Sequence, residues 1–166
     1  MKTSRLTIGA VVILSFVLFS FVPPVFSQQS PPPSDQVKRI EALVDKAAAK
    51  VNSEGKAAFS DFRKEGSEWW LGETYLFAYD LNANVLLVAA FPQNEGTNRS
   101  GKADSNGKLY HDEFVKVAQS SKGSGWVDYM FPKPGQTQPS QKWSYVKAMT
   151  IDGTPGLIAA GFYPAN

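Results

Sequence analysis

The spacing of the hydrophobic residues changes from helical to strand-like after Gly66, and this change constrains the fold more than any other feature. Between Asp35 and Val51 aliphatic residues recur every three or four positions, which predicts a helix that Ser34 or Asp35 can cap. A second, shorter helix is expected to end at Gly66. From residue 75 onward, the sequence consists of short runs rich in aromatic and β-branched residues, which are typical of strands.

The predicted strands lie at residues 75–80, 85–90, 125–131, 142–151 and 156–163, with one more helix at 110–119. A turn-rich link at 81–84 joins the first two strands into a hairpin, and Asp152-Gly153 joins the last two. Residues 92–108 are rich in Asn, Gly, Ser and charge, so we expect a long loop there. This order predicts an α+β domain in which a long N-terminal helix packs on an antiparallel sheet of about five strands.

The first 27 residues have the layout of a secretory signal peptide. Lys2 and Arg5 form a positive start, an apolar run follows, and Ser27 supplies a small residue for cleavage. The apolar run approaches the roughly 20 residues that span a bilayer, so an uncleaved membrane anchor is the alternative. Cleavage near Ser27 would give a periplasmic or secreted protein with a proline-rich spacer at 28–34 and one domain at 35–166.

The charge balance and the composition exclude several classes of function. Lys2 and Arg5 are two of the 17 basic residues, so 15 basic residues remain against 15 acidic ones. This balance leaves no positive excess for a nucleic-acid backbone. The sequence has no Cys, one His and no EF-hand spacing, so we expect no metal site, no cofactor and no enzyme activity. The single histidine, His111, is expected to be solvated in the first turn of its helix.

Two neighbouring aromatic runs each carry a charge among their rings. Asp128 lies in GWVDYMF, and Lys142 lies in KWSYVKA. In a regular strand Trp126 and Tyr129 face opposite sides, and so do Lys142 and Tyr145, unless a bulge intervenes. A pocket under the 92–108 loop would use Lys142 as a cation for a carboxylate. The alternative is a plain sheet whose lysines extend to solvent.

Three motifs occur in a characteristic order, and they read TYLFAYDLNANVLLVA, DSNGKLYHDEFVKVAQ, and GSGWVDYMFPKPGQTQPSQKWSYVKAM followed by GLIAAGFY. Together they resemble the single Cache domain, an extracytoplasmic sensor domain with a PAS-like fold. The resemblance covers most of the chain after the signal segment. It implies a ligand pocket between the sheet and its covering loops, and members of the family commonly bind small organic molecules, often short carboxylates.

The resemblance also implies which residues form the pocket and how the protein acts. The matching motifs supply Trp126, Tyr129, Lys142 and Tyr145, with Tyr75 and Phe77 from the first hairpin, and Asp128 completes the candidate set. Because the sequence ends at Asn166, directly after the last predicted strand, we expect an exported sensor that signals through a separate membrane receptor or kinase. The alternative is a structural or interaction module, or an accessory subunit, with no small ligand.

Overall fold

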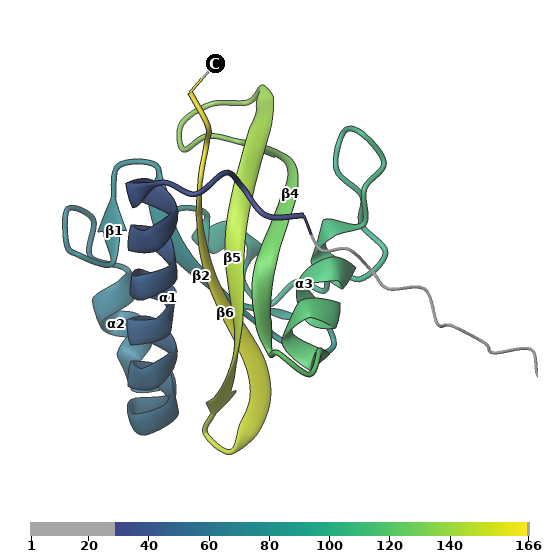
Figure 1. Ribbon diagram of the computed structural model, residues 1–166. Coiled ribbons are helices and arrows are strands. Elements are labelled where there is room, and N and C mark those ends of the chain that lie inside the picture. The colour runs from purple at the N-terminus through teal and green to yellow at the C-terminus, as the bar shows by residue number, and fades with distance from the viewer. Residues whose placement is uncertain (1–28, 166) are drawn as a thin grey trace, which may run out of the picture.

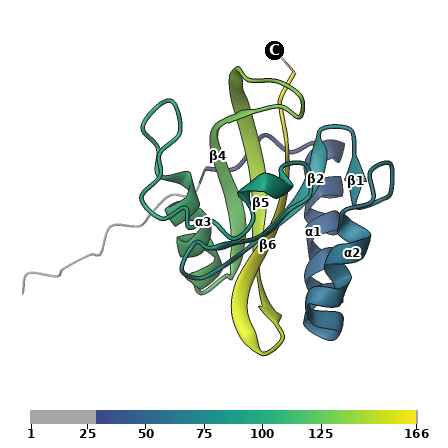
Figure 2. The ribbon, with the colours of Figure 1, turned by 180° about the vertical axis from the view of Figure 1, so that it is seen from behind.

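The computed structural model describes residues 29–165 and shows a long helix on one face of an antiparallel sheet (Figure 1). The expected signal segment, residues 1–27, lies outside the described residues. Residues 29–34 of the spacer contain no helix or strand and cross the sheet on the same face as the long helix (Figures 1 and 2). Within this segment Pro31 is buried, so the spacer packs on the domain.

The long helix, α1, spans Asp35–Glu54. The side chain of Ser34 caps its N-terminus by accepting a hydrogen bond from the Val37 amide at 3.2 Å, which confirms the expected cap. The helix ends at Gly55, whose φ of 61° suits a residue without a side chain. The predicted second helix is a 3₁₀ turn, η1 (Gly55–Ala58), followed by the single α-helical turn α2 (Phe59–Phe62).

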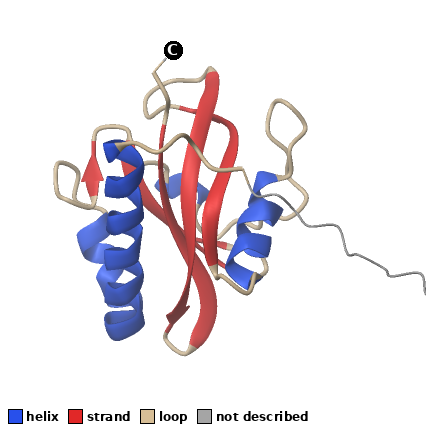
Figure 3. Cartoon of the chain, in the orientation of Figure 1, coloured by secondary structure: helices blue, strands red, loops and turns tan. Residues whose placement is uncertain are grey.

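The sheet of the described residues has six strands, namely β1 (Trp70–Leu71), β2 (Thr74–Asp80), β3 (Val85–Val88), β4 (Ser124–Pro132), β5 (Pro139–Ile151) and β6 (Thr154–Phe162). Their order is β1-β2-β6-β5-β4, and β3 pairs with β2 (Figure 3). The additional strand is β1, which is two residues long and pairs with the start of β2. The prediction of about five strands on a long helix is thus confirmed, with one short strand added.

Each face of the sheet buries its own hydrophobic core. On one face α1 packs through Val44 and Val51 against residues that include Leu76 and Ile158. The other face is covered by α3 (Tyr110–Gln119) and carries a cluster rich in rings. Because side chains alternate along a strand, neighbours such as Leu76 and Phe77 belong to different cores. This second, aromatic face carries the candidate ligand site.

The segment between β3 and α3 covers the aromatic face. It contains the short helix η2 (Pro92–Asn94) and otherwise has the loop character that the composition predicts. Glu95 holds this loop in place, because its carboxylate accepts hydrogen bonds from Arg63 at 2.6 and 2.8 Å and from the Val88 amide at 3.0 Å. Asp112 ties down the far end by accepting hydrogen bonds from Ser100 and Gly101.

Candidate ligand-binding site

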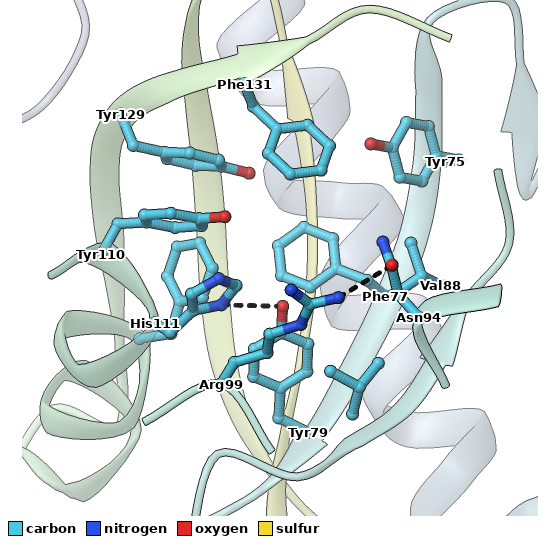
Figure 4. Close-up of a pocket in the computed structure, with 12 residues that line it drawn as sticks. Tyr75, Phe77, Tyr79, Val88, Asn94, Arg99, Tyr110, His111, Tyr129 and Phe131 are labelled. Atoms are coloured by element: carbon cyan, nitrogen blue, oxygen red, sulfur yellow. Dashed lines mark hydrogen bonds between the residues drawn. The ribbon is translucent and has the colours of Figure 1, made fainter. Parts of the chain in front are cut away.

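A small cavity lies on the aromatic face, between β2, β4, α3 and the loop that covers them (Figure 4). Its volume is about 50 Å³, and its walls are mostly aromatic. Twelve residues line it, and these are Tyr75, Phe77, Tyr79, Val85, Val88, Asn94, Arg99, Tyr110, His111, Phe114, Tyr129 and Phe131. None of them is a carboxylate, so the walls provide hydroxyl groups and positive charge without an acidic side chain.

The rings are placed by strand alternation on one side and by the helical repeat on the other. Tyr75, Phe77 and Tyr79 occupy alternate positions of β2 and therefore share a face. From the opposite wall, Tyr110 at the start of α3 stacks on Tyr129 of β4 with ring centroids 4.3 Å apart and planes 5° apart. Burial raises the pKa of Tyr75 and of Tyr129, so both hydroxyls stay protonated and can donate hydrogen bonds.

Arg99 brings a guanidinium group to the cavity from the covering loop. Its Nη2 donates a hydrogen bond to Oδ1 of Asn94 at 2.8 Å (Figure 4), and its backbone amide donates to the carbonyl of Ala83 at 2.9 Å. Within residues 29–165, no carboxylate forms an ion pair with this arginine. The guanidinium is therefore positioned by polar contacts while its charge remains uncompensated.

Lys142 of β5 lies just outside the cavity wall. Its side chain is 1% exposed, and its Nζ donates a hydrogen bond to the Tyr75 hydroxyl at 2.9 Å. Four rings surround the amine, with centroids 4.1 Å (Tyr75), 5.1 Å (Tyr163), 5.4 Å (Phe131) and 5.9 Å (Phe77) from Nζ. Removal from water lowers the pKa of Lys142 from its ordinary value of 10.5 to about 7, and the charge of Glu73 opposes this shift only in part.

The residues predicted from the sequence divide into three groups in the structure. Tyr75, Phe77 and Tyr129 line the cavity, and Lys142 lies next to it through Tyr75. Trp126 and Tyr145 pack on the opposite face, in the core under α1, because β4 and β5 pair in regular register without a bulge. Asp128 accepts a hydrogen bond from Lys108 at 2.6 Å and does not line the cavity.

His111 differs from the sequence-based expectation, because it is buried and not solvated. It is 5% exposed, its ring packs on Tyr79 and Tyr110, and its Nδ1 shares a hydrogen bond with the Tyr79 hydroxyl at 3.0 Å. Burial, together with the charge of Arg99, lowers the pKa of His111 from 6.5 to about 4. His111 and Arg99 were not among the predicted site residues. The one available signal for His111 was its helical spacing from Phe114, three positions on.

A buried neutral histidine makes stability depend on pH in a specific window. The unfolded chain binds a proton at His111 below about pH 6.5, whereas the folded chain does so only below about pH 4. Stability should therefore fall by about 2 kcal/mol between pH 6.5 and 4.5. Urea unfolding at several pH values measures this slope. Because His111 is the single histidine, most of the slope should disappear in His111→Phe, and an equal slope in that variant would contradict the assignment.

The fold and the cavity together define an α+β domain with a long helix on one face of an antiparallel sheet and a small aromatic cavity on the other. Comparison with known protein families matches residues 35–163 to the Cache domain. The chain therefore belongs to the Cache domain family, whose members are extracytoplasmic ligand-binding sensor domains and not a class of enzymes. Across residues 29–165, no helix has the length and apolar character required to cross a bilayer.

Several proteins similar to this chain are chemotaxis proteins. The methyl-accepting chemotaxis protein McpP of Pseudomonas putida is 29% identical over 91 residues, which is 55% of this chain and 16% of that protein. The chain thus spans a small part of the curated relative that it matches. The solved periplasmic sensor domain of a chemotaxis protein is 30% identical, with a TM-score of 0.59, and the match covers 75% of this chain and 88% of that one.

Two further solved structures share the fold at lower identity. One is a Cache chemosensory domain described for its recognition of carboxylic acid, with 22% identity, a TM-score of 0.65 and coverage of 78% of this chain and 94% of that one. The other is a methyl-accepting chemotaxis protein from Vibrio parahaemolyticus, with 20% identity, a TM-score of 0.63 and coverage of 77% and 88%. These likenesses confirm the α+β Cache fold.

Proposed function

We propose that this chain is an exported sensor domain that binds a small organic anion, such as a short carboxylate, in the cavity on the aromatic face. The observation that carries the proposal is the uncompensated charge of Arg99 in a cavity without carboxylates. A guanidinium group matches a carboxylate through two parallel hydrogen bonds. The hydroxyls of Tyr75 and Tyr110, which point toward the middle of the cavity in Figure 4, can donate further hydrogen bonds to the ligand oxygens.

The size of the cavity restricts the ligand class further. One water-sized group needs about 10–15 Å³ of such a cavity, so about 50 Å³ suits an acid with a few carbon atoms and is too small for a nucleotide or a sugar chain. The apolar parts of Phe77 and Phe131 can pack on the carbon chain of such an acid. The similarity to a Cache chemosensory domain described for carboxylic acid recognition supports the same class of ligand.

The domain would be exported and would signal through a separate partner. A signal segment at residues 1–27 would deliver the domain across the membrane, and a separate receptor or kinase would respond to its occupancy. The second candidate function is an interaction module whose cavity stays unoccupied, and the small volume of the cavity is the observation that favours it. A thermal-shift screen with acids of two to four carbons separates the two functions, because a ligand at a hundred times its Kd stabilises a protein by about 2.7 kcal/mol.

Arg99→Gln is expected to lower the affinity for a carboxylate found in that screen by about 10- to 100-fold. The reason is that a hydrogen bond to a charged group contributes about 1.5–3 kcal/mol. The melting temperature of the free variant should stay close to that of the wild type, since Arg99 makes no ion pair among the described residues. Isothermal titration calorimetry measures the affinity. Lys102→Gln, an exposed position in the same loop, is the matched control. Equal affinities of the two variants would contradict the role of Arg99.

A further inference from the structure

We infer that the site takes a proton as a second ligand, so that binding of an organic anion in the cavity is accompanied by proton uptake at Lys142. The inference rests on the proposed function, because it describes how the same cavity is regulated. It makes the domain a joint detector of an anion and of pH. Three features of the structure support it: the surroundings of Lys142, its connection to the cavity, and the behaviour of the other titratable groups.

The surroundings of Lys142 leave its ammonium form poorly compensated. An ammonium group has three N–H donors, and the described residues provide one acceptor, the Tyr75 hydroxyl. No carboxylate within residues 29–165 lies in ion-pair distance of Lys142. Glu73, which precedes β2, acts on it only at longer range and already pairs with Lys133 at 3.0 Å.

The residues packed around the Lys142 amine present aromatic rings to it. Tyr75 and Phe77 come from β2, Phe131 comes from β4, and Tyr163 follows β6. The faces of these rings attract a cation, whereas the loss of water disfavours it. The loss of water outweighs the attraction of the rings and lowers the pKa of Lys142 to about 7. A modest change in the local electric field can therefore change the protonation state.

The connection between Lys142 and the cavity runs through Tyr75. This tyrosine lines the cavity, and its hydroxyl oxygen accepts the hydrogen bond from Nζ of Lys142. When the lysine is charged, it donates to that oxygen, and the Tyr75 hydroxyl proton is left for another acceptor, which is Tyr163 in the free protein and can be a bound anion. When the lysine is neutral, its lone pair competes for the same proton. An anion in the cavity thus favours the charged lysine both by attraction and through this hydrogen bond.

The other groups of the cavity do not titrate between pH 6 and 9. Burial lowers the pKa of His111 to about 4 and raises that of each lining tyrosine, Tyr75, Tyr79, Tyr110 and Tyr129. The Arg99 guanidinium stays charged throughout this range. A short carboxylic acid is fully ionised above pH 6. A change of affinity in this window therefore reports on Lys142, and affinity should fall as the pH rises.

Calorimetry of the full chain with acetate and propionate as probes tests the inference. Titrations at pH 7.5 in buffers of different ionisation enthalpy give the number of protons bound with the ligand, and we expect roughly half a proton per ligand. Between pH 6 and 9 the affinity of the wild type should fall about tenfold. NMR titration of the Lys142 side chain without ligand should show a midpoint near pH 7.

Two lysine variants show whether Lys142 is the residue that takes up the proton. Lys142→Met should bind without proton uptake and with an affinity that is independent of pH. Lys147→Met, a lysine that pairs with Asp45 on the opposite face, should behave as the wild type does. Binding without proton uptake, or a Lys142 midpoint above pH 9, would overturn the inference and leave the proposed function standing. If neither probe nor any other short carboxylate binds, the proposed function fails, and the inference fails with it.

Discussion

At pH 6, Lys142→Met should raise the melting temperature of the free protein by about 5 °C or more and weaken the binding of a carboxylate ligand about tenfold. The two effects have one cause, because the wild type keeps a cation in a buried site that a ligand would compensate. Methionine fills a similar volume among the four rings without a charge to desolvate. Thermal unfolding and calorimetry, each at pH 6 and 9, measure the two effects.

The dependence on pH follows from the direction of the pKa shift. The pKa of Lys142 is lowered by burial from 10.5 in the unfolded chain to about 7 in the folded one. The destabilisation is therefore complete below pH 7, decreases as the pH rises from 7 to 10.5, and is absent above that range. The stability advantage of Lys142→Met should accordingly be larger at pH 6 than at pH 9.

Lys147→Met is the control for both effects, because Lys147 is partly exposed and pairs with Asp45 at 2.6 Å. It should change neither the ligand affinity nor the pH dependence. A Lys142→Met protein that unfolds, or that melts lower than the wild type at pH 6, would make Lys142 a structural residue held by its ring cage. Asp128 cannot take the role of its structural partner, since its carboxylate is bound to Lys108.

Gly161→Ala is expected to destabilise the domain by about 3 kcal/mol, which is at the upper end of typical overpacking effects. Gly161 of β6 pairs with Ser144 of β5 at the centre of the sheet. A Cβ atom there would overlap the Ser144 hydroxyl and the backbone carbonyl of Trp143, and would come within 3.1 Å of Cε of Lys142. The glycine thus makes room for the buried lysine stem. Chemical unfolding of the variant measures the loss.

Gly101→Ala is the matched control for this substitution. Gly101 lies in the covering loop, where an added Cβ would meet no atom within 4 Å, although its φ of 70° disfavours alanine. The expected loss of stability comes from the unfavourable backbone conformation alone and is roughly 1 kcal/mol. Adding Ser144→Ala to Gly161→Ala should restore little stability, because the Trp143 carbonyl still blocks the Cβ atom. Full recovery in the double variant would show that the serine alone causes the clash.

Local sequence patterns were sufficient to predict most of the elements. The helical spacing around Val44 and Val51 predicts α1, and Ser34 predicts its cap, because capping and periodicity involve neighbouring residues only. The bounds of α3 follow in the same way from its spacing. The strand β1 could not be predicted, because two residues carry no periodicity, and their pairing with Thr74 and Tyr75 depends on a turn between them.

The sequence by itself determined most of the elements, their order, and the alternation of side chains along each strand, because these depend on local spacing. It even indicated that Lys142 and Tyr145 point to opposite sides of the sheet. Only the tertiary structure decided which face encloses the cavity and which distant residues meet there. Arg99 reaches the site because Glu95 and Asp112 anchor its loop, and His111 is buried because α3 docks on Tyr79. Such contacts join residues far apart in the chain, and no local pattern encodes them.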